Sequence, residues 1–164
     1  MATDGDGDAD TSSVGRRRRR PEPTPTQRAL SLLTRREHSR VELERKLLQR
    51  GVEAGLAMEA INRLTEAGWQ NDARFAASLV RSRAESGYGP LYVRAELKTH
   101  GLPSAQIDEA LEAYEGDWLE NMRHLLERRY PQAAESREVQ RKAIDFLLRR
   151  GFALELIYRV LREE

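Results

Sequence analysis

The sequence contains no cysteine, no long hydrophobic run and few aromatic residues. Because none of its 164 residues is Cys, it offers neither a disulfide framework nor a thiolate metal site. No window approaches the roughly 18 consecutive apolar residues of a membrane span, and the first thirty residues lack the apolar stretch of a signal peptide. The chain is also too short for a large catalytic barrel. We therefore expect a cytoplasmic protein with no membrane partner.

Opposite charges nearly cancel in total but are unevenly placed along the chain. The 28 Lys and Arg residues exceed the 27 Asp and Glu residues by one. Residues 1–15 contain four Asp and no basic residue, whereas residues 16–50 contain twelve basic and four acidic residues. Residues 51–115 contain six basic and ten acidic residues, and residues 116–164 are nearly neutral. The distribution of charge therefore says more about partners than the net charge does.

Residues 1–26 have the composition of a disordered tail. They contain almost no large apolar side chain, a run of arginines from Arg16 to Arg20, and alternating prolines. Such a segment cannot offset its ordering entropy by burial. The arginine run suits a polyanion such as nucleic acid, but it also suits a solubilising tail in which nearby Asp residues balance the charge. The sequence leaves both interpretations open.

From Thr26 onward the pattern is helical, because apolar residues recur three and four positions apart and the alternation of strands is absent. The segment Ser39–Glu42 predicts a capping box, Asn71 a helix start and Pro103 a first helical position. Glycines and Pro131 predict helix ends. The predicted helices cover residues 27–37, 40–50, 53–67, 72–86, 90–100, 103–115, 117–130, 137–150 and 153–163.

An internal repeat organises these helices. Gly51, Gly101 and Gly151 lie 50 residues apart, and a leucine stands four residues before each of them. Glycine suits a structural turn here, because helices commonly end at a residue with positive φ. The repeat predicts an all-α fold of three tandem three-helix modules that share burial in an elongated, curved array. The predicted modules span residues 27–68, 69–115 and 116–164.

Apolar positions on one side of each helix predict the core. Trp69 and Trp118 stand at the entries to the second and third modules, where each either links neighbouring modules or packs as an ordinary helix-entry residue. The predicted core residues are Leu30, Leu33, Val41, Leu47, Ile61, Leu64, Phe75, Leu79, Val93, Leu97, Ile107, Leu111, Leu125, Ile144, Leu147, Phe152, Ile157 and Leu161.

No group of residues predicts catalysis or metal binding. His38, His100 and His124 have no Cys or carboxylate partner at metal-ligand spacing, so each is interpreted as a surface or helix-end histidine. Glu42 and Lys46, four residues apart, are interpreted as a solvated pair that stabilises a helix face. We therefore expect neither an enzyme nor a bound cofactor.

Basic residues recur in all three modules and predict a binding surface. Arg74 and Arg81 are seven residues apart on one helix, and Arg94 and Lys98 are four apart on the next. The alternative for each residue is a solvated face on which Arg and Lys alternate with Glu. The candidate contact residues are Arg74, Arg81, Arg83, Arg94, Lys98, Arg149 and Arg150.

Several short motifs occur in a fixed order along the modules. They are Ser39–Leu43 with Leu47 and Gly51, then Trp69–Ala76, Arg83, Gly87–Pro90, Glu96–Leu97 and Gly101–Leu102, and finally Phe146–Phe152. This order resembles the RecX family of bacterial recombinase regulators over about residues 27–164. The run Arg16–Arg20 is not part of the shared pattern.

The resemblance implies a noncatalytic regulator of RecA. Members of the family bind the RecA filament on single-stranded DNA, lie in its helical groove and inhibit ATP hydrolysis, strand exchange and co-protease activity. The chain is thereby expected to modulate DNA repair, recombination and the SOS response, with the RecA filament as partner and single- and double-stranded DNA as further partners. We expect it to act as a monomer.

Two functions of other classes fit the same pattern. The first is a helix-turn-helix protein that binds DNA directly, since a turn glycine is followed six residues later by Ile107 or Ile157. The leucine four residues before each glycine argues against it, because a close helix crossing favours a small residue there. The second is a helical scaffold that binds helices of other proteins.

Overall fold

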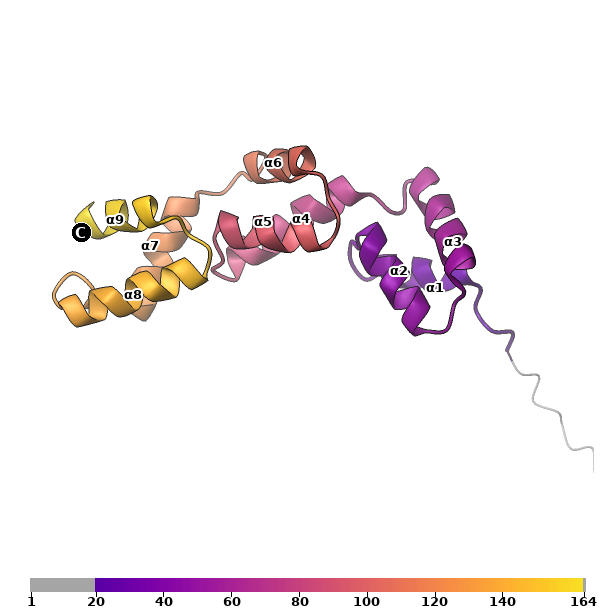
Figure 1. Cartoon of the computed structure of the whole chain (residues 1–164), viewed down its shortest axis with the longest axis horizontal. Helices are drawn as coiled ribbons and strands as arrows, with labels where there is room; N and C mark the ends of the chain where they lie inside the picture. The colour runs from indigo at the N-terminus through magenta and orange to yellow at the C-terminus, as the bar shows by residue number, and fades with distance from the viewer. Residues whose placement is uncertain (1–19, 164) are drawn as a thin grey trace, which may run out of the picture.

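A computed structural model describes residues 20–163, which fold into nine α-helices with no strand (Figure 1). The predicted all-α fold class is therefore confirmed for this part of the chain. Residues 1–19 of the predicted tail, and with them Arg16–Arg19, lie outside the described residues; residues 20–26 are described, and α1 already begins at Pro25, within the predicted tail. The helices are α1 (Pro25–Leu33), α2 (Arg40–Gln49), α3 (Ala54–Glu66), α4 (Asp72–Glu85), α5 (Pro90–Thr99), α6 (Ser104–Glu112), α7 (Trp118–Arg129), α8 (Arg137–Arg149) and α9 (Leu154–Glu163).

Polar side chains cap most helix starts. Ser39 accepts a hydrogen bond from the amide of Glu42 at the start of α2, as predicted. The predicted capping box is only half formed, because the Glu42 carboxylate pairs with basic side chains and not with the Ser39 amide. A complete capping box occurs instead at the start of α1, between Thr24 and Gln27.

Predicted helix boundaries are wrong by two residues or more at both ends of α1 and at the end of α6, which stops at Glu112 and not at residue 115. The helix α1 ends at Leu33 and not at residue 37, because the amides of Thr34 and Arg35 already close the last turn on Leu30 and Leu32. The residue Pro103 is the N-cap of α6 and not its first helical residue, since its ψ of 148° is extended.

The nine helices form a row of three modules, each with its own small core (Figure 1). Two positions of the second helix of each module are fully buried, and they recur with the 50-residue period. They are Leu43 and Leu47 in α2, Val93 and Leu97 in α5, and Ala143 and Leu147 in α8. A strict repeat of burial at the same positions confirms the tandem three-helix architecture.

The core prediction fails at Val41, whose side chain is 45% exposed. Because α2 turns Leu43 and Leu47 inward, a residue two positions before Leu43 lies on the opposite side of the helix. Five other predicted core residues are only partly buried at the edges of the cores: Leu30, Leu33, Leu79, Leu111 and Ile144.

The two tryptophans behave differently. Trp118 begins α7 yet packs against the core of the second module, where its ring lies 4.6 Å from that of Tyr114. It therefore links the second and third modules. Trp69 is 55% exposed and makes no such link through its ring.

Three turn glycines have positive φ, as their role requires. The φ angles of Gly51, Gly101 and Gly151 are 79°, 73° and 88°. A Cβ atom at Gly51 would meet no other atom, whereas one at Gly101 would touch Val41 and one at Gly151 would clash with the backbone of Tyr92. The second and third turns therefore also form the contacts between modules.

The ends of the array differ from its internal junctions. The carbonyl of Arg150 accepts a backbone hydrogen bond from the second module, but the equivalent carbonyl of Arg50 accepts one from the side chain of Arg28 in its own module. At the other end, α8 begins three residues earlier in the repeat than α2 or α5. Groups used at internal junctions are thus occupied within the chain at both ends.

Candidate basic interface

Within residues 20–163, no three His, Asp or Glu side chains gather as metal ligands. No helix in that range has the length and apolar character to cross a bilayer. The features that remain are an exposed face and a groove between modules, and both carry basic side chains.

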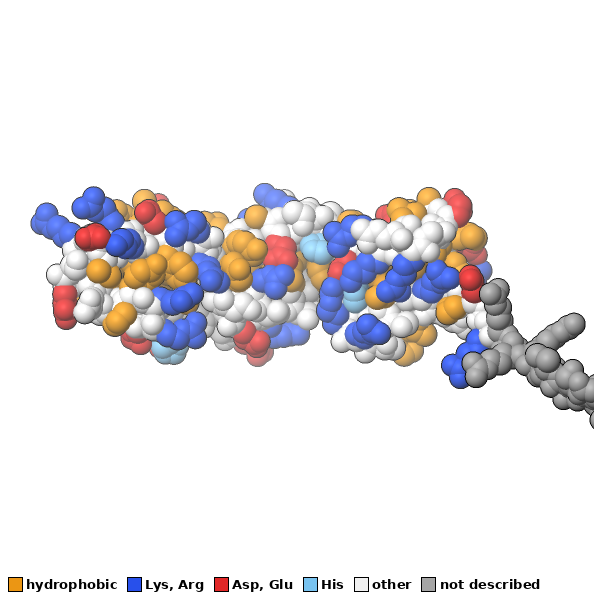
Figure 2. All heavy atoms as spheres, turned by 90° about the horizontal axis from the view of Figure 1, so that it is seen from below, with side chains coloured by type: hydrophobic (Ala, Val, Ile, Leu, Met, Phe, Trp, Pro, Cys, Tyr) orange, Lys and Arg blue, Asp and Glu red, His pale blue; other side chains and the backbone are white. Residues whose placement is uncertain are grey.

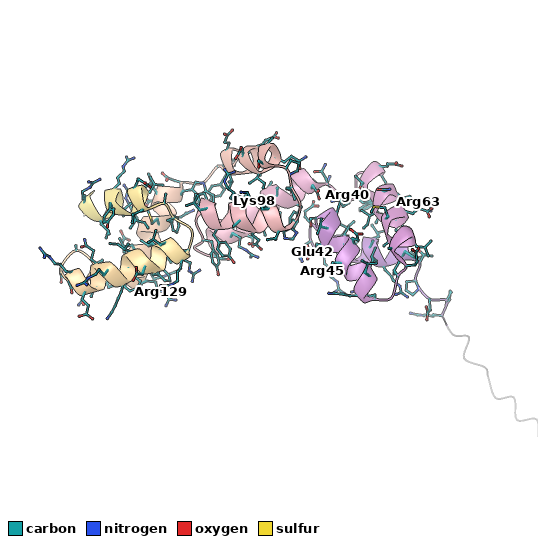
Figure 3. All side chains as sticks on the ribbon, viewed as in Figure 1. Arg40, Glu42, Arg45, Arg63, Lys98 and Arg129 are labelled. Carbon is teal, nitrogen blue, oxygen red and sulfur yellow. The ribbon has the colours of Figure 1, made fainter. Side chains whose placement is uncertain are left out.

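The second helices α2, α5 and α8 expose basic and apolar side chains together, and some of these stand at the same position of the repeat, as Leu48, Lys98 and Leu148 do. We call this set the second-helix face; it consists of Val41, Arg45, Leu48, Leu91, Lys98, Leu148 and Arg149. Figure 2 shows Lys and Arg side chains gathered over the first and third modules on the underside of the molecule, with hydrophobic side chains exposed between them. Arg45 and Lys98 project from neighbouring modules (Figure 3). Such a mixture suits a protein or nucleic-acid partner.

Three of the seven predicted contact residues are exposed cations with no ion pair among the described residues. Lys98 and Arg149 belong to the second-helix face. Arg81 does not, because it lines a separate hollow of about 380 Å³ between α4 and α6, next to Glu85 and Tyr114. The structure therefore places the three free cations on two different surfaces.

Arg83 is engaged inside the second module. Its guanidinium donates two hydrogen bonds of 2.7 Å to the carboxylate of Glu96, joining α4 to α5. These bonds raise the pKa of Arg83 above its ordinary value, so the pair stays charged. The geometry gives Arg83 a structural role in the packing of the module.

Arg94 and Arg74 also have carboxylate partners. Arg94 pairs with Asp108 of α6 at 2.6 Å, within the second module. Arg74 donates to the Glu37 carboxylate at 2.9 Å and to the carbonyl of Gly68 at 2.8 Å, which ties α4 to the first module. Both charges are thus partly neutralised within the chain.

Arg150 joins the second and third modules. Its guanidinium lies 4.5 Å from the ring centre of Tyr88 and 5.1 Å from that of Phe146, and it donates to the Ser86 carbonyl at 3.2 Å. Its own carbonyl accepts the amide of Gly89 at 2.7 Å. Arg149, one residue earlier, makes none of these contacts.

A groove of about 620 Å³ separates the first and second modules. Its walls include Arg45 from α2 and the hydroxyl residues Ser78, Ser82 and Thr99 from the second module. His100 lies at the same groove, where its ring approaches Phe75 at 4.6 Å. The groove is polar and open, so it is accessible to water and to a charged partner.

One sequence interpretation beside this groove is wrong: Glu42 is 6% exposed and not solvated. His38, predicted as a surface or helix-end residue, directly precedes the N-cap Ser39 of α2 and is 2% exposed. Burial alone would raise the pKa of Glu42, but hydrogen bonds from Arg36 and Lys46 lower it to about 2. The imidazole of His38 lies against this cluster, 3.1 Å from the Lys46 ammonium.

Histidines 100 and 124 lie where the sequence suggested. His100 is the C-cap of α5, and its Nδ1 lies 2.7 Å from the hydroxyl of Ser39 in the first module. His124 is exposed on α7 and pairs with Glu120 at 3.0 Å. Burial lowers the pKa of His100 below its usual value, as it does for His38.

Sequence reasoning missed the apolar members of the second-helix face and underrated Arg45. Val41, Leu48, Leu91 and Leu148 look like core residues when helical spacing is considered alone. Alignment of the three modules on their turn glycines separates them from the core, because their positions fall outside the two that are fully buried in every second helix. A comparison of every position of the second helix across the three modules would have identified these exposed apolar residues from the sequence.

Comparison with known proteins shows similarity along most of the described chain. Three family models match in chain order, described as RecX, first three-helix domain (residues 26–64), RecX, second three-helix domain (residues 71–111), and RecX, third three-helix domain (residues 115–161). Together they cover well over half of the chain.

Individual relatives carry the same family name. A regulatory protein RecX of Xanthomonas axonopodis pv. citri (strain 306) is 61% identical over 127 residues, covering 77% of this chain and 78% of the relative. One of Stenotrophomonas maltophilia (strain K279a) is 58% identical over 137 residues, covering 83% and 84%. The crystal structure of RecX from Lactobacillus salivarius matches with a TM-score of 0.71 at 26% identity, over 85% of this chain and 93% of that one. A second crystal structure of a regulatory protein RecX, 21% identical, shares the fold with a TM-score of 0.72 and covers 85% of this chain and 70% of its own.

Proposed function

This chain belongs to the RecX family, and we propose from that premise that it binds the RecA filament on single-stranded DNA and inhibits its activities. Inhibition extends to RecA ATP hydrolysis, strand exchange and co-protease activity, so the chain modulates recombination and repair in the cytoplasm. It acts as a noncatalytic monomer.

The observation that supports a filament partner is the second-helix face. Its free cations Lys98 and Arg149 stand on equivalent helices of consecutive modules, among exposed apolar side chains. A row of equivalent helices along an elongated molecule suits a partner that is itself long and repetitive. Apolar contact then supplies affinity to protein, and the cations attract acidic groups or DNA phosphates.

All seven predicted basic residues remain proposed contacts, and the free cations rank first among them. Lys98, Arg149 and Arg81 bring charge to a partner without first breaking an internal ion pair. Arg74, Arg83, Arg94 and Arg150 contribute by holding helices and modules in place, and any contact they make uses hydrogen-bonding capacity left over from their partners.

The proposal is tested by adding the purified chain to RecA on single-stranded DNA with ATP and following hydrolysis at several salt concentrations. We expect inhibition that weakens as salt rises, since exposed charges are screened. The double variant Lys98→Glu, Arg149→Glu is expected to lose at least about tenfold in potency, roughly 1.4 kcal/mol. Arg81→Glu tests the separate hollow on α4.

The control is Arg63→Glu on α3, which makes the same change of charge as either single substitution, at an exposed residue outside the second-helix face that is paired with Glu59. It should retain nearly full potency. Unchanged hydrolysis at stoichiometric wild-type protein would refute the proposed function. Tight, sequence-dependent binding to naked duplex DNA at physiological salt would favour the helix-turn-helix alternative, and partner binding without any salt effect would favour the scaffold.

A further inference from the structure

We propose that the junction between the first and second modules is an acid-sensitive hinge, whereas the junction between the second and third modules is rigid. The hinge is held closed by polar side chains that we call the latch, namely Glu37, Ser39, Gln70, Asp72, Arg74 and His100. When the latch opens, the first module moves relative to the other two, which move together.

The two junctions use equivalent positions of the repeat but different bonds. At the second junction, the amides of Gly89 and Leu91 donate to the carbonyls of Arg150 and Gly151, at 2.7 Å and 3.0 Å. A Cβ atom at Gly89 would collide with the carbonyl of Gly151, so the two backbones are in direct contact. Because these bonds join backbone atoms, no rotation of a side chain can break them. The contact is lost only if the two modules separate.

Apart from the amides of Trp69 and Gln70, which close the end of α3 on the Leu64 carbonyl, the first junction contains no backbone-to-backbone hydrogen bond between its two modules in the described residues. At the positions equivalent to Gly89 and Arg150 stand Ser39 and His100, which meet through their side chains at 2.7 Å. Beside them, the backbone amide of Arg40 donates to the side-chain carboxylate of Asp72 at 3.0 Å. The side-chain amide of Gln70 donates to the backbone carbonyl of His38 at 3.3 Å. Each of these bonds depends on a side chain that rotates independently of the helices.

The groove described above lies at this junction and gives it room to move. Its open space of about 620 Å³ lies between α2 on one side and α4 and α5 on the other. Water therefore reaches one side of the latch and can replace its hydrogen bonds as they break. The exposed pair of Glu37 and Arg74 is the most easily replaced, because both side chains are partly solvated.

Acid acts on the latch through the two histidines. The Nδ1 atom of His38 lies 3.0 Å from the Arg36 carbonyl, which only accepts, so Nδ1 carries the proton of the neutral ring. Its Nε2 then accepts from the Lys46 ammonium, and a proton added there would face that cation. With Nδ1 of neutral His100 unprotonated, the hydroxyl of Ser39 donates to it; protonation of His100 turns Nδ1 into a donor, so the hydrogen of this fully buried hydroxyl loses its acceptor.

Both acidic and basic groups surround these two imidazole rings, and they have opposite effects on protonation. Glu42 on α2 favours the protonated form of each ring, and Glu96 on α5 favours that of His100, although Glu96 is already paired with Arg83. Arg36 and Lys46 oppose protonation of His38, while Arg36 and Arg45 oppose that of His100. Burial is the largest influence on both pKa values and lowers them, so neutral rings favour the closed latch.

The test measures distances across both junctions. Because the chain has no native Cys, spin labels can be placed at Glu59→Cys on α3, Glu109→Cys on α6 and Glu155→Cys on α9. Double electron–electron resonance is then recorded at about pH 7.5 and about pH 5.5, on either side of the usual histidine pKa. We expect a second, longer distance to appear on acidification for the pair 59–109, and no change for the pair 109–155.

Variants assign the effect to the latch. His100→Ala should give the longer 59–109 distance already at about pH 7.5, because it removes the contact with Ser39 but leaves the N-cap of α2 intact. His38→Gln with His100→Gln should keep a single distance at both pH values. Equal changes across both junctions, or no change across either, would overturn the proposal; far-UV circular dichroism on the same samples identifies unfolding, which would change both pairs.

Discussion

The backbone amide of Gly89 donates a 2.7 Å hydrogen bond to the carbonyl oxygen of Arg150, 61 residues later in the chain. The same separation, one repeat earlier, connects Ser39 and His100, whose side chains lie 2.7 Å apart. One repeat position therefore serves both junctions between modules. Its chemistry changes from backbone contact to side-chain contact, and this difference gives the two junctions different sensitivities to mutation and pH.

The three turn glycines should respond differently to alanine. Gly51→Ala should cost about 1 kcal/mol of unfolding free energy, because only the positive φ opposes it. Gly101→Ala should cost about as much or slightly more, since its Cβ would also touch Val41. Gly151→Ala should cost at least about 2 kcal/mol, because its Cβ would collide with the backbone of Tyr92. Denaturant melts of the three variants measure this order, and equal losses would contradict it.

Glu42 should contribute strongly to stability in spite of its charge. Replacing it with Gln leaves Arg36 and Lys46 without their shared carboxylate, so we expect a loss on the order of 2 kcal/mol. Since the folded pKa of about 2 lies below the usual value of 4.5, this contribution is complete above about pH 4.5 and disappears as the pH falls toward 2. Glu44→Gln on the same helix is the control. Parallel acid denaturation curves for Glu42→Gln and wild type would argue against this role.

The buried histidines should weaken the fold at mildly acidic pH. Because burial lowers the pKa values of His38 and His100 below the usual 6.5, the folded state favours neutral rings. Their stabilising effect is therefore complete above about pH 6.5 and is lost as the pH falls through their lowered values. We expect the thermal midpoint to fall between about pH 7 and 5.5, and to fall less for His38→Gln with His100→Gln. His124→Gln, at an exposed site on α7, is the control for the loss of a histidine.

Arg83 should contribute to stability, whereas Lys98 should contribute to partner binding. Arg83→Ala removes two hydrogen bonds to partly buried Glu96, and we expect it to lower the unfolding free energy by about 1–2 kcal/mol. Lys98→Ala should change it by less than about 0.5 kcal/mol, since no ion pair is lost among the described residues. Urea melts provide the first measurement and inhibition of RecA ATP hydrolysis the second. A large stability loss for Lys98→Ala would remove the distinction.

Adjacent arginines at the end of α8 offer a matched pair. Arg150→Ala removes contacts to Tyr88, Phe146 and the Ser86 carbonyl, so it should destabilise the chain by about 1–2 kcal/mol. Arg149→Ala has the same change of charge one residue away and should be nearly neutral for stability. Thermal unfolding compares the two directly. Similar losses for both would contradict the assigned role of Arg150 at the junction.

The helices and their repeat are determined largely by local chemistry, and the sequence predicted them well. Turn glycines, N-caps such as Ser39 and Asn71, and apolar spacing act within a few residues, so they are visible in the chain. The threefold period then predicts which positions pack together inside each module. Where helix boundaries were wrong, as at Leu33, the error was a few residues at a terminus.

Which charges are free and which are engaged was decided only by the tertiary structure. Arg149 and Arg150 are adjacent residues of the same type, yet Arg149 is exposed and Arg150 lies over the ring of Tyr88 in another module. Glu42 has the spacing of a solvated ion pair, but its carboxylate is buried and shared between Arg36 and Lys46. Periodicity assigns a residue to a side of its own helix, whereas burial and pairing depend on what the rest of the chain brings to that side. For this protein, the sequence therefore determined the modules, and packing between the modules determined which residues remain available to a partner.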